Sequence, residues 1–281
     1  MSLRNELRQP LTNWTLLEES YNWETWYQYT KIGADAVHAS NPVPLIFLSG
    51  MDSSTQFDRI VRGQTFTPST ATFSKADFDG YVDKLALEMH SYSILDSDKP
   101  KDCPSFEKKL HDKGFETLTD TAVNQFPLLM TEFGFTQDET TWKTDKYATC
   151  ITDYLPRQKV GWFIWVIAGS YYIREGDQSY DESWGLLDTT WSQWRSPEFV
   201  DGMLRGMVNA TLDLVRSNGV GGEGGEEGVE NGPGRDGNEN SNGGQTEAGS
   251  GSQVGENTAA QSPQALSVGL AWLALGALLF L

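Results

Sequence analysis

The stretch Pro44-Leu45-Ile46-Phe47-Leu48-Ser49 is an uninterrupted apolar run of strand length. A strand without polar positions has both faces buried, as in a parallel sheet that is covered on each side. Three more strand-like runs lie at 84–90, 126–131 and 161–167, so the four runs begin 40, 42 and 35 residues apart. This regular spacing predicts parallel strands that are joined by helices.

Helical patterns occupy the segments between these runs. Apolar and aromatic residues recur at helical spacing within 21–39, and further helices are expected near 105–113, 145–155 and 197–215. A short strand is expected at 2–5. A doubly wound open sheet is the main competing architecture, but no glycine-rich phosphate loop follows any of the strands. Polar and acidic residues gather instead at the carboxyl ends of the strands, which favours an α/β fold of the (β/α)8 TIM-barrel type.

Two glutamates follow strands of this predicted barrel. Glu6 comes after the short amino-terminal strand, and Glu132 directly follows the run at 126–131. Two carboxylates at strand ends suggest the acid/base and nucleophile pair of a glycosidase. We expect burial beside the second carboxylate to keep Glu6 protonated at the working pH.

Three more side chains lie at the ends of the predicted strands. His90 and Tyr92 share one face of their strand and could hold the Glu132 carboxylate in its ionised form. The indole of Trp165 could form the floor of a sugar site. Each residue alone is more often structural, since a buried histidine is usually a satisfied core residue. The hypothesis depends on their occurrence at consecutive strand ends.

These residues carry a resemblance to a known family. Arg4-Asn5-Glu6, His90-Ser91-Tyr92, Thr131-Glu132-Phe133-Gly134 and Trp165 resemble, in this order, the site motifs of the family 5 glycoside hydrolases, the cellulase family. The stretch from Gly169 to Gly176 resembles secreted fungal members. The resemblance implies a retaining mechanism on a (β/α)8 barrel, with the acid/base at the end of the fourth strand and the nucleophile at the end of the seventh. It also implies that no metal or organic cofactor is needed.

The resemblance assigns a role to each site residue: Glu6 is the acid/base, Glu132 the nucleophile, Asn5 a ligand of the sugar 2-hydroxyl, His90 and Tyr92 supports, and Trp165 the sugar platform. This chain has Leu7 where the commoner family motif has proline. The first three strands have no counterpart, so we expect residues 1–216 to form an incomplete barrel, about strands four to eight, truncated at the amino terminus. The alternative is a catalytically inactive, wall-associated glycan-binding or structural remnant.

Charge and composition change sharply near the carboxyl end. Residues 217–264 are rich in Gly, Glu, Asn and Ser and predict a disordered linker and spacer. Eight acids and one arginine between Gly219 and Ser262 contribute −7 of the net charge of −18. Because binding to nucleic acid requires basic patches, an acidic domain of this kind is not expected to bind it. We expect a monomer that acts on a polysaccharide or glycoside.

The last segment, 265–281, is uncharged and mostly apolar. Together with the polar spacer before it and the small residues at Ser250-Gly251-Ser252, it has the layout of a signal for glycosylphosphatidylinositol (GPI) attachment, with Ser250 as the candidate attachment site. The alternative is a tail-anchored membrane helix. The GPI interpretation predicts a secreted protein held at the cell surface, although no signal peptide is seen at the amino terminus.

Two cysteines and two sequons agree with secretion. Cys103 and Cys150 fall at or in the helices that follow two consecutive strands, so either one disulfide or two buried thiols is possible. Asn13 and Asn209 each begin an Asn-X-Thr sequence and are candidate N-glycosylation sites.

Overall fold

The computed structural model describes residues 1–94, 99–138 and 140–217. The predicted linker from residue 218 onward, the candidate anchor site Ser250 and the apolar tail at 265–281 lie outside the described residues. Within the part that is described, no helix is both long enough and apolar enough to cross a membrane.

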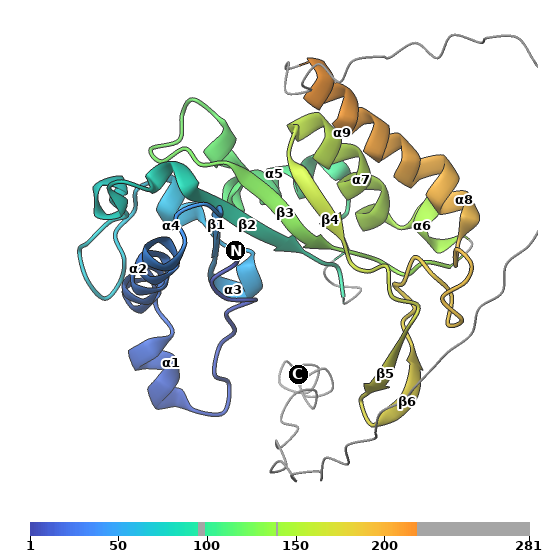
Figure 1. Ribbon diagram of the computed structural model, residues 1–281, viewed down its shortest axis with the longest axis horizontal. Helices are drawn as coiled ribbons and strands as arrows, with labels where there is room; N and C mark the ends of the chain where they lie inside the picture. The colour runs from blue at the N-terminus through green and yellow to red at the C-terminus, as the bar shows by residue number, and fades with distance from the viewer. Residues whose placement is uncertain (95–98, 139, 218–281) are drawn as a thin grey trace, which may run out of the picture. The chain divides into compact units, whose positions relative to one another are not determined.

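The centre of the fold is a parallel sheet of four strands in chain order (Figure 1). Its strands are β1 (Ile46–Ser49), β2 (Leu85–Ser91), β3 (Leu128–Phe133) and β4 (Gly161–Ile164). Ser2 adds a parallel bridge to Phe47 on the outer side of β1. The four predicted strands at 44–49, 84–90, 126–131 and 161–167 are therefore confirmed, whereas the short strand expected at 2–5 is only an isolated bridge at Ser2 beside β1.

The long helices begin at side chains that cap them. In α2 (Trp23–Ser40), α5 (Cys103–Lys113) and α7 (Lys146–Gln158), the side chains of Asn22, Asp102 and Asp145 each accept a hydrogen bond from a backbone N–H of the first turn. The carboxyl-terminal helical stretch consists of α8 (Pro197–Phe199), the π-helical η5 (Val200–Leu204) and α9 (Arg205–Ser217). These helices confirm the four helical segments that the sequence predicts.

Shorter helices occupy the connections. They are α1 (Trp14–Ser20), α3 (Met51–Ser54), α4 (Asp58–Val61) and α6 (Thr141–Thr144), with 3-10 turns at Lys75–Phe78, Val82–Lys84 and Phe115–Leu118.

The register of the main sheet is irregular at two places, one between β2 and β3 and one between β3 and β4. All seven residues of β2 are buried, as suits a strand with neighbours on both sides. The register shifts between Met89 and His90, so that His90 lies opposite Glu132. A second shift occurs between Met130 and Phe133, where β3 pairs with β4. Such irregularities often redirect side chains beside functional sites. The shift between β2 and β3 places His90 opposite the Glu132 carboxylate.

A β-hairpin forms between the predicted strand at 161–167 and the predicted helix at 197–215. Strands β5 (Ser170–Arg174) and β6 (Asp177–Asp181) pair antiparallel, and they extend away from the main sheet in Figure 1. Glu175 and Gly176 connect them with φ angles of 57° and 92°. Two consecutive positive φ angles are typical of the two-residue turns whose twist matches that of a hairpin.

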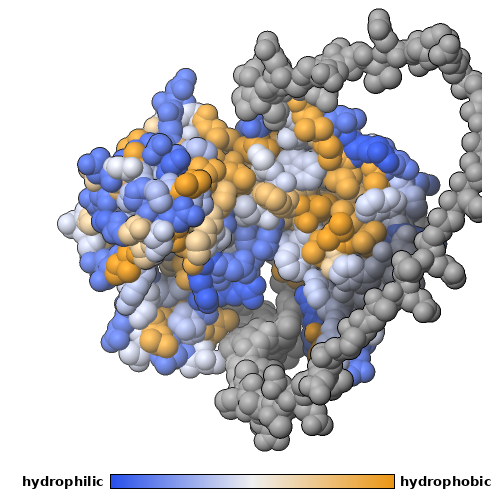
Figure 2. Space-filling view, viewed as in Figure 1, coloured by the Kyte–Doolittle hydropathy of each residue, from blue (hydrophilic) through white to orange (hydrophobic). Residues whose placement is uncertain are grey.

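Apolar side chains remain at the surface near the last strand. Phe163 in β4 is 58% exposed, and Val208 and Leu212 in α9 are also exposed. Figure 2 shows apolar surface on this side of the molecule. Since β2 is fully buried, coverage of the sheet decreases from its centre toward β4.

Candidate active site

The amino-terminal segment is held against β1 by backbone hydrogen bonds. The N–H of Leu3 donates to the carbonyl of Phe47 at 3.2 Å, and the N–H of Phe47 donates to the carbonyl of Met1 at 2.9 Å. The chain runs parallel to β1, so Glu6 is carried toward the carboxyl end of the sheet, where the ends of β2 and β3 also lie.

A buried carboxylate that sequence reasoning did not single out also anchors this segment. Glu88 in β2 is 4% exposed, and its Oε1 accepts a hydrogen bond from the Ser2 hydroxyl at 2.5 Å. The hydroxyl of Ser49, at the end of β1, donates to the same oxygen. The amino-terminal segment, β1 and β2 are thereby joined through one carboxylate oxygen.

The predicted catalytic pair meets at His90. Its Nδ1 lies 3.0 Å from Oε1 of Glu6 and 3.6 Å from Oε2 of Glu132. One oxygen of Glu6, one oxygen of Glu132 and one ring nitrogen of His90 all lie within 4.8 Å of one another. The two glutamates lie 126 positions apart in the sequence, yet both carboxylates approach the same nitrogen of His90.

Tyr92 supports the second carboxylate. Its hydroxyl donates to Oε2 of Glu132 at 2.8 Å. Burial of the phenol, and next its hydrogen bond to the Glu132 carboxylate, raise the pKa of Tyr92 well above its usual range. Tyr92 is therefore a neutral donor at every pH at which the protein would work, and its hydrogen bond orients the Glu132 carboxylate.

Glu6 departs from the prediction that burial keeps it protonated. Burial is the largest single influence and acts to raise its pKa, but the hydrogen bonds from His90 and Arg8 and the charge of Arg8 outweigh it. The pKa of Glu6 is therefore lowered. Arg8 lies two residues further along and holds Oε2 through Nε, at 3.1 Å, and through Nη2. Burial acts as expected, but the prediction of a protonated Glu6 was wrong because sequence spacing did not place the Arg8 guanidinium on this carboxylate.

The two remaining predicted residues lie close to the pair along the chain. Asn5 directly precedes Glu6, and its side chain is exposed. Trp165 follows β4 and is half-buried, and its backbone N–H donates to the carbonyl of Phe133 at 2.7 Å. This hydrogen bond places the Trp165 backbone beside Phe133, the residue that follows Glu132 in β3.

Gly134 has a steric reason to be glycine. A Cβ at this position would lie 2.3 Å from the Trp165 carbonyl oxygen and 3.2 Å from Cε3 of Trp184. Both tryptophans therefore approach the end of β3 closely. Trp184 also packs against the Tyr92 ring, with centroids 5.5 Å apart. Sequence reasoning missed Trp184, because only the return of its loop along the end of β4 brings it here.

The cysteines and sequons lie away from this cluster. Cys103 at the start of α5 and Cys150 in α7 form a disulfide, with their Cα atoms 5.2 Å apart. The side chain of Asn13 caps α1, and Asn209 is exposed on α9.

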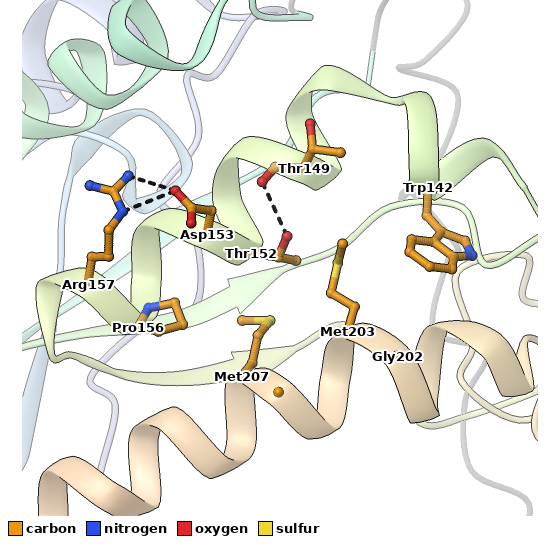
Figure 3. A pocket seen from close by; sticks show the side chains of 10 residues that line it. Trp142, Thr149, Thr152, Asp153, Pro156, Arg157, Gly202, Met203 and Met207 are labelled. Carbon is orange, nitrogen blue, oxygen red and sulfur yellow. Dashed lines mark hydrogen bonds and ion pairs between the residues drawn. The ribbon is translucent and has the colours of Figure 1, made fainter.

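A separate cavity of about 560 Å³ lies between α7 and the η5–α9 stretch (Figure 3). Its lining includes Trp142, Met203 and Met207, with the ion pair of Asp153 and Arg157 at one end. None of its lining residues belongs to the carboxylate cluster.

Comparison with known proteins identifies the family of these motifs. Residues 1–170 match the model of the cellulase family, glycosyl hydrolase family 5. A glycosyl hydrolase 5 family protein from Chamaecyparis obtusa is 30% identical over 211 residues, which cover 71% of this chain and 34% of that protein.

Two solved structures show more distant similarity. A β-glucanase from Saccharophagus degradans is 17% identical with a TM-score of 0.45, over 68% of this chain and 48% of that one. The catalytic domain of the major endoglucanase from Xanthomonas campestris is 18% identical with a TM-score of 0.41, over 67% and 50%. The chain thus spans about a third of the curated relative and about half of these enzymes.

Proposed function

Because the chain belongs to glycosyl hydrolase family 5, we propose that it hydrolyses the O-glycosidic bonds of β-linked glucan, or of a related polysaccharide or glycoside, with retention at the anomeric carbon. The observation that carries this proposal is the approach of the Glu6 and Glu132 carboxylates, since one oxygen of Glu6 lies within 4.8 Å of one oxygen of Glu132. Retaining glycosidases place their two carboxyl groups about 5 to 5.5 Å apart, whereas inverting enzymes leave room for a water at about 6.5 to 9.5 Å.

In the first step, Glu132 attacks the anomeric carbon and forms a glycosyl ester. Glu6 gives its proton to the glycosidic oxygen, so the leaving sugar departs as a neutral alcohol. In the second step, Glu6 takes a proton from water while the water oxygen attacks the anomeric carbon. The ester bond breaks, Glu132 is regenerated as a carboxylate, and Glu6 is protonated again.

The surrounding side chains suit these two roles. The Tyr92 hydroxyl aims Oε2 of Glu132 and stabilises its charge. His90 Nδ1 holds the Glu6 carboxylate through a hydrogen bond at 3.0 Å and lies 3.6 Å from Glu132. Asn5 is assigned to the 2-hydroxyl of the sugar and Trp165 to a sugar platform, in agreement with their places beside the pair.

The lowered pKa of Glu6 has a consequence for the first step. The free protein holds Glu6 largely as the carboxylate that the second step needs, whereas the first step needs the acid. Hydrolysis should therefore be fastest at acidic pH. A glycan that displaces Arg8 from Oε2, or that shields the pair from water, would raise the pKa of Glu6 and assist proton donation.

The proposal includes a secreted protein of the fungal type that is held at the cell surface by a GPI anchor and acts as a monomer. Support comes from the disulfide, since such bonds persist in oxidising compartments, and from the composition of the carboxyl-terminal segment. Release from membranes by a phosphatidylinositol-specific phospholipase tests the anchor, and protein that stays membrane-bound contradicts it.

Hydrolysis of an aryl β-cellobioside by the purified chain tests the activity. Glu132→Gln should abolish turnover but leave binding of cello-oligosaccharides, as measured by calorimetry, within a few fold. Glu24→Gln, an exposed position in the first turn of α2, is the matched control and should hydrolyse like the parent. Turnover by the Glu132 variant at the parent rate would exclude the assignment.

A further inference from the structure

The loop that follows the β5–β6 hairpin reaches into the site through Trp184. Its ring lies against Tyr92 on one side and close to Gly134 on another. The backbone is fixed as well, because the N–H of Val166 donates to the Trp184 carbonyl at 3.3 Å and the N–H of Gln137 donates to that of Ser183 at 2.9 Å. Trp184 therefore lies between the ends of β3 and β4, directly behind the ring that holds the nucleophile.

A buried glutamate fixes Trp184 from below. Glu182 is 5% exposed, and its Oε1 accepts a hydrogen bond from the backbone N–H of Trp184 at 3.1 Å. Its other oxygen, Oε2, accepts one from the guanidinium of Arg174 at 2.6 Å. A buried carboxylate with both oxygens engaged in charge-assisted bonds has little freedom to move, and it passes this rigidity to the peptide it holds.

Arg174 connects this glutamate to the hairpin. It is the last residue of β5, and its guanidinium lies 4.9 Å from the Tyr171 ring centroid and 5.6 Å from that of Tyr180. Tyr171 and Tyr180 are cross-strand partners in the hairpin, and their contacts with the guanidinium restrict its orientation. A continuous set of contacts thus runs from the hairpin through the Arg174–Glu182 ion pair to Trp184 and Tyr92. It ends at the hydrogen bond of Tyr92 to Oε2 of Glu132.

We propose that Glu182 and Arg174 are positioning residues for the nucleophile, and that they act through Trp184 and Tyr92. The inference rests on the proposed function, in which Glu132 attacks the sugar. If the ion pair is lost, the Trp184 peptide is released and the Tyr92 ring loses its support. Its hydroxyl then no longer stays 2.8 Å from the carboxylate. Misplacement of a reacting group by about 1 Å can cost on the order of 100-fold in rate.

The neighbouring acid provides a matched control. Asp181 pairs with Arg195 at 2.6 Å, as Glu182 pairs with Arg174, but its side chain is 54% exposed and it holds no atom of Trp184. Glu182→Gln keeps an acceptor for the Trp184 N–H but removes the charge that orients Arg174. We expect this variant to lower kcat by about tenfold or more, whereas Asp181→Asn stays within about twofold of the parent.

A double-mutant cycle with Tyr92→Phe separates positioning from a general structural role. If Glu182 acts through the Tyr92 hydroxyl, Glu182→Gln should lower kcat by less than about twofold once that hydroxyl is absent. Trp184→Leu removes the supporting ring and should behave like Glu182→Gln. If Glu182→Gln does not fold, Trp184→Leu takes its place in the cycle. A tenfold loss that persists in the Tyr92→Phe background, or equal losses in the Glu182 and Asp181 variants, would overturn the proposal.

Hydroxyl-radical footprinting tests the same contacts without hydrolysis. Glu182→Gln should raise the oxidation of Trp184 and Tyr92 severalfold, and Asp181→Asn should leave it at the parent level. A parent that hydrolyses no glycoside yet shows this footprint would refute the proposed function and leave the contacts established. An active parent whose footprint and kcat do not change in Glu182→Gln would refute the positioning role alone.

Discussion

Replacing Tyr92 by phenylalanine isolates the hydrogen bond that supports the nucleophile. The substitution removes one oxygen and keeps the ring that packs on Trp184, so the shape of the site is retained. The bond that is lost is 2.8 Å long and joins a neutral phenol to a half-buried carboxylate. Hydrogen bonds to charged groups contribute about 1.5 to 3 kcal/mol. A loss of this size at the transition state lowers kcat/KM by about 10- to 150-fold.

Steady-state kinetics on an aryl β-cellobioside measure this loss. Tyr172→Phe, at a tyrosine that is 82% exposed, is the control and should hydrolyse like the parent. Equal kcat/KM values for the two variants, both within twofold of the parent, would refute the role of Tyr92.

Two further predictions concern Glu6 and the disulfide. Arg8→Met removes influences that lower the pKa of Glu6, so this pKa should rise. Because the first step uses the acid form, the basic limb of kcat/KM should move to higher pH, and an unchanged basic limb contradicts the ion pair. Replacing Cys103 and Cys150 by alanine removes a cross-link over 47 positions, worth about 4 kcal/mol in the chain-entropy account. Thermal unfolding should then occur about 8 to 16 °C lower, and a decrease below about 3 °C would contradict the estimate.

Much of the fold could be predicted because each strand of the main sheet contains a run of apolar residues. The runs near 44, 84, 126 and 161 became β1 to β4 in chain order. Parallel strands point their carboxyl ends to the same edge of a sheet, so residues at those ends could be expected to meet. His90, Tyr92 and the two glutamates do meet there.

The parts that could not be predicted depend on contacts between distant segments. Nothing in the local pattern shows that Trp184 returns to the end of β3 or that Glu182 is buried beneath it. The β5–β6 hairpin was missed because Glu175-Gly176 is not among the strongest hairpin-turn signals. The ion pair of Arg8 with Glu6 forms in a segment without regular structure, where sequence spacing does not define a direction.

The central claim is that Glu132 forms a covalent bond to the sugar. Incubation with an activated 2-deoxy-2-fluoro-β-cellobioside slows breakdown of a glycosyl-enzyme intermediate, and mass spectrometry of proteolytic peptides then locates the adduct. The account predicts one equivalent of the fluorinated sugar on Glu132 and none on Glu132→Gln. A labelled Glu6 or Glu88, or an active protein that forms no adduct, would contradict it.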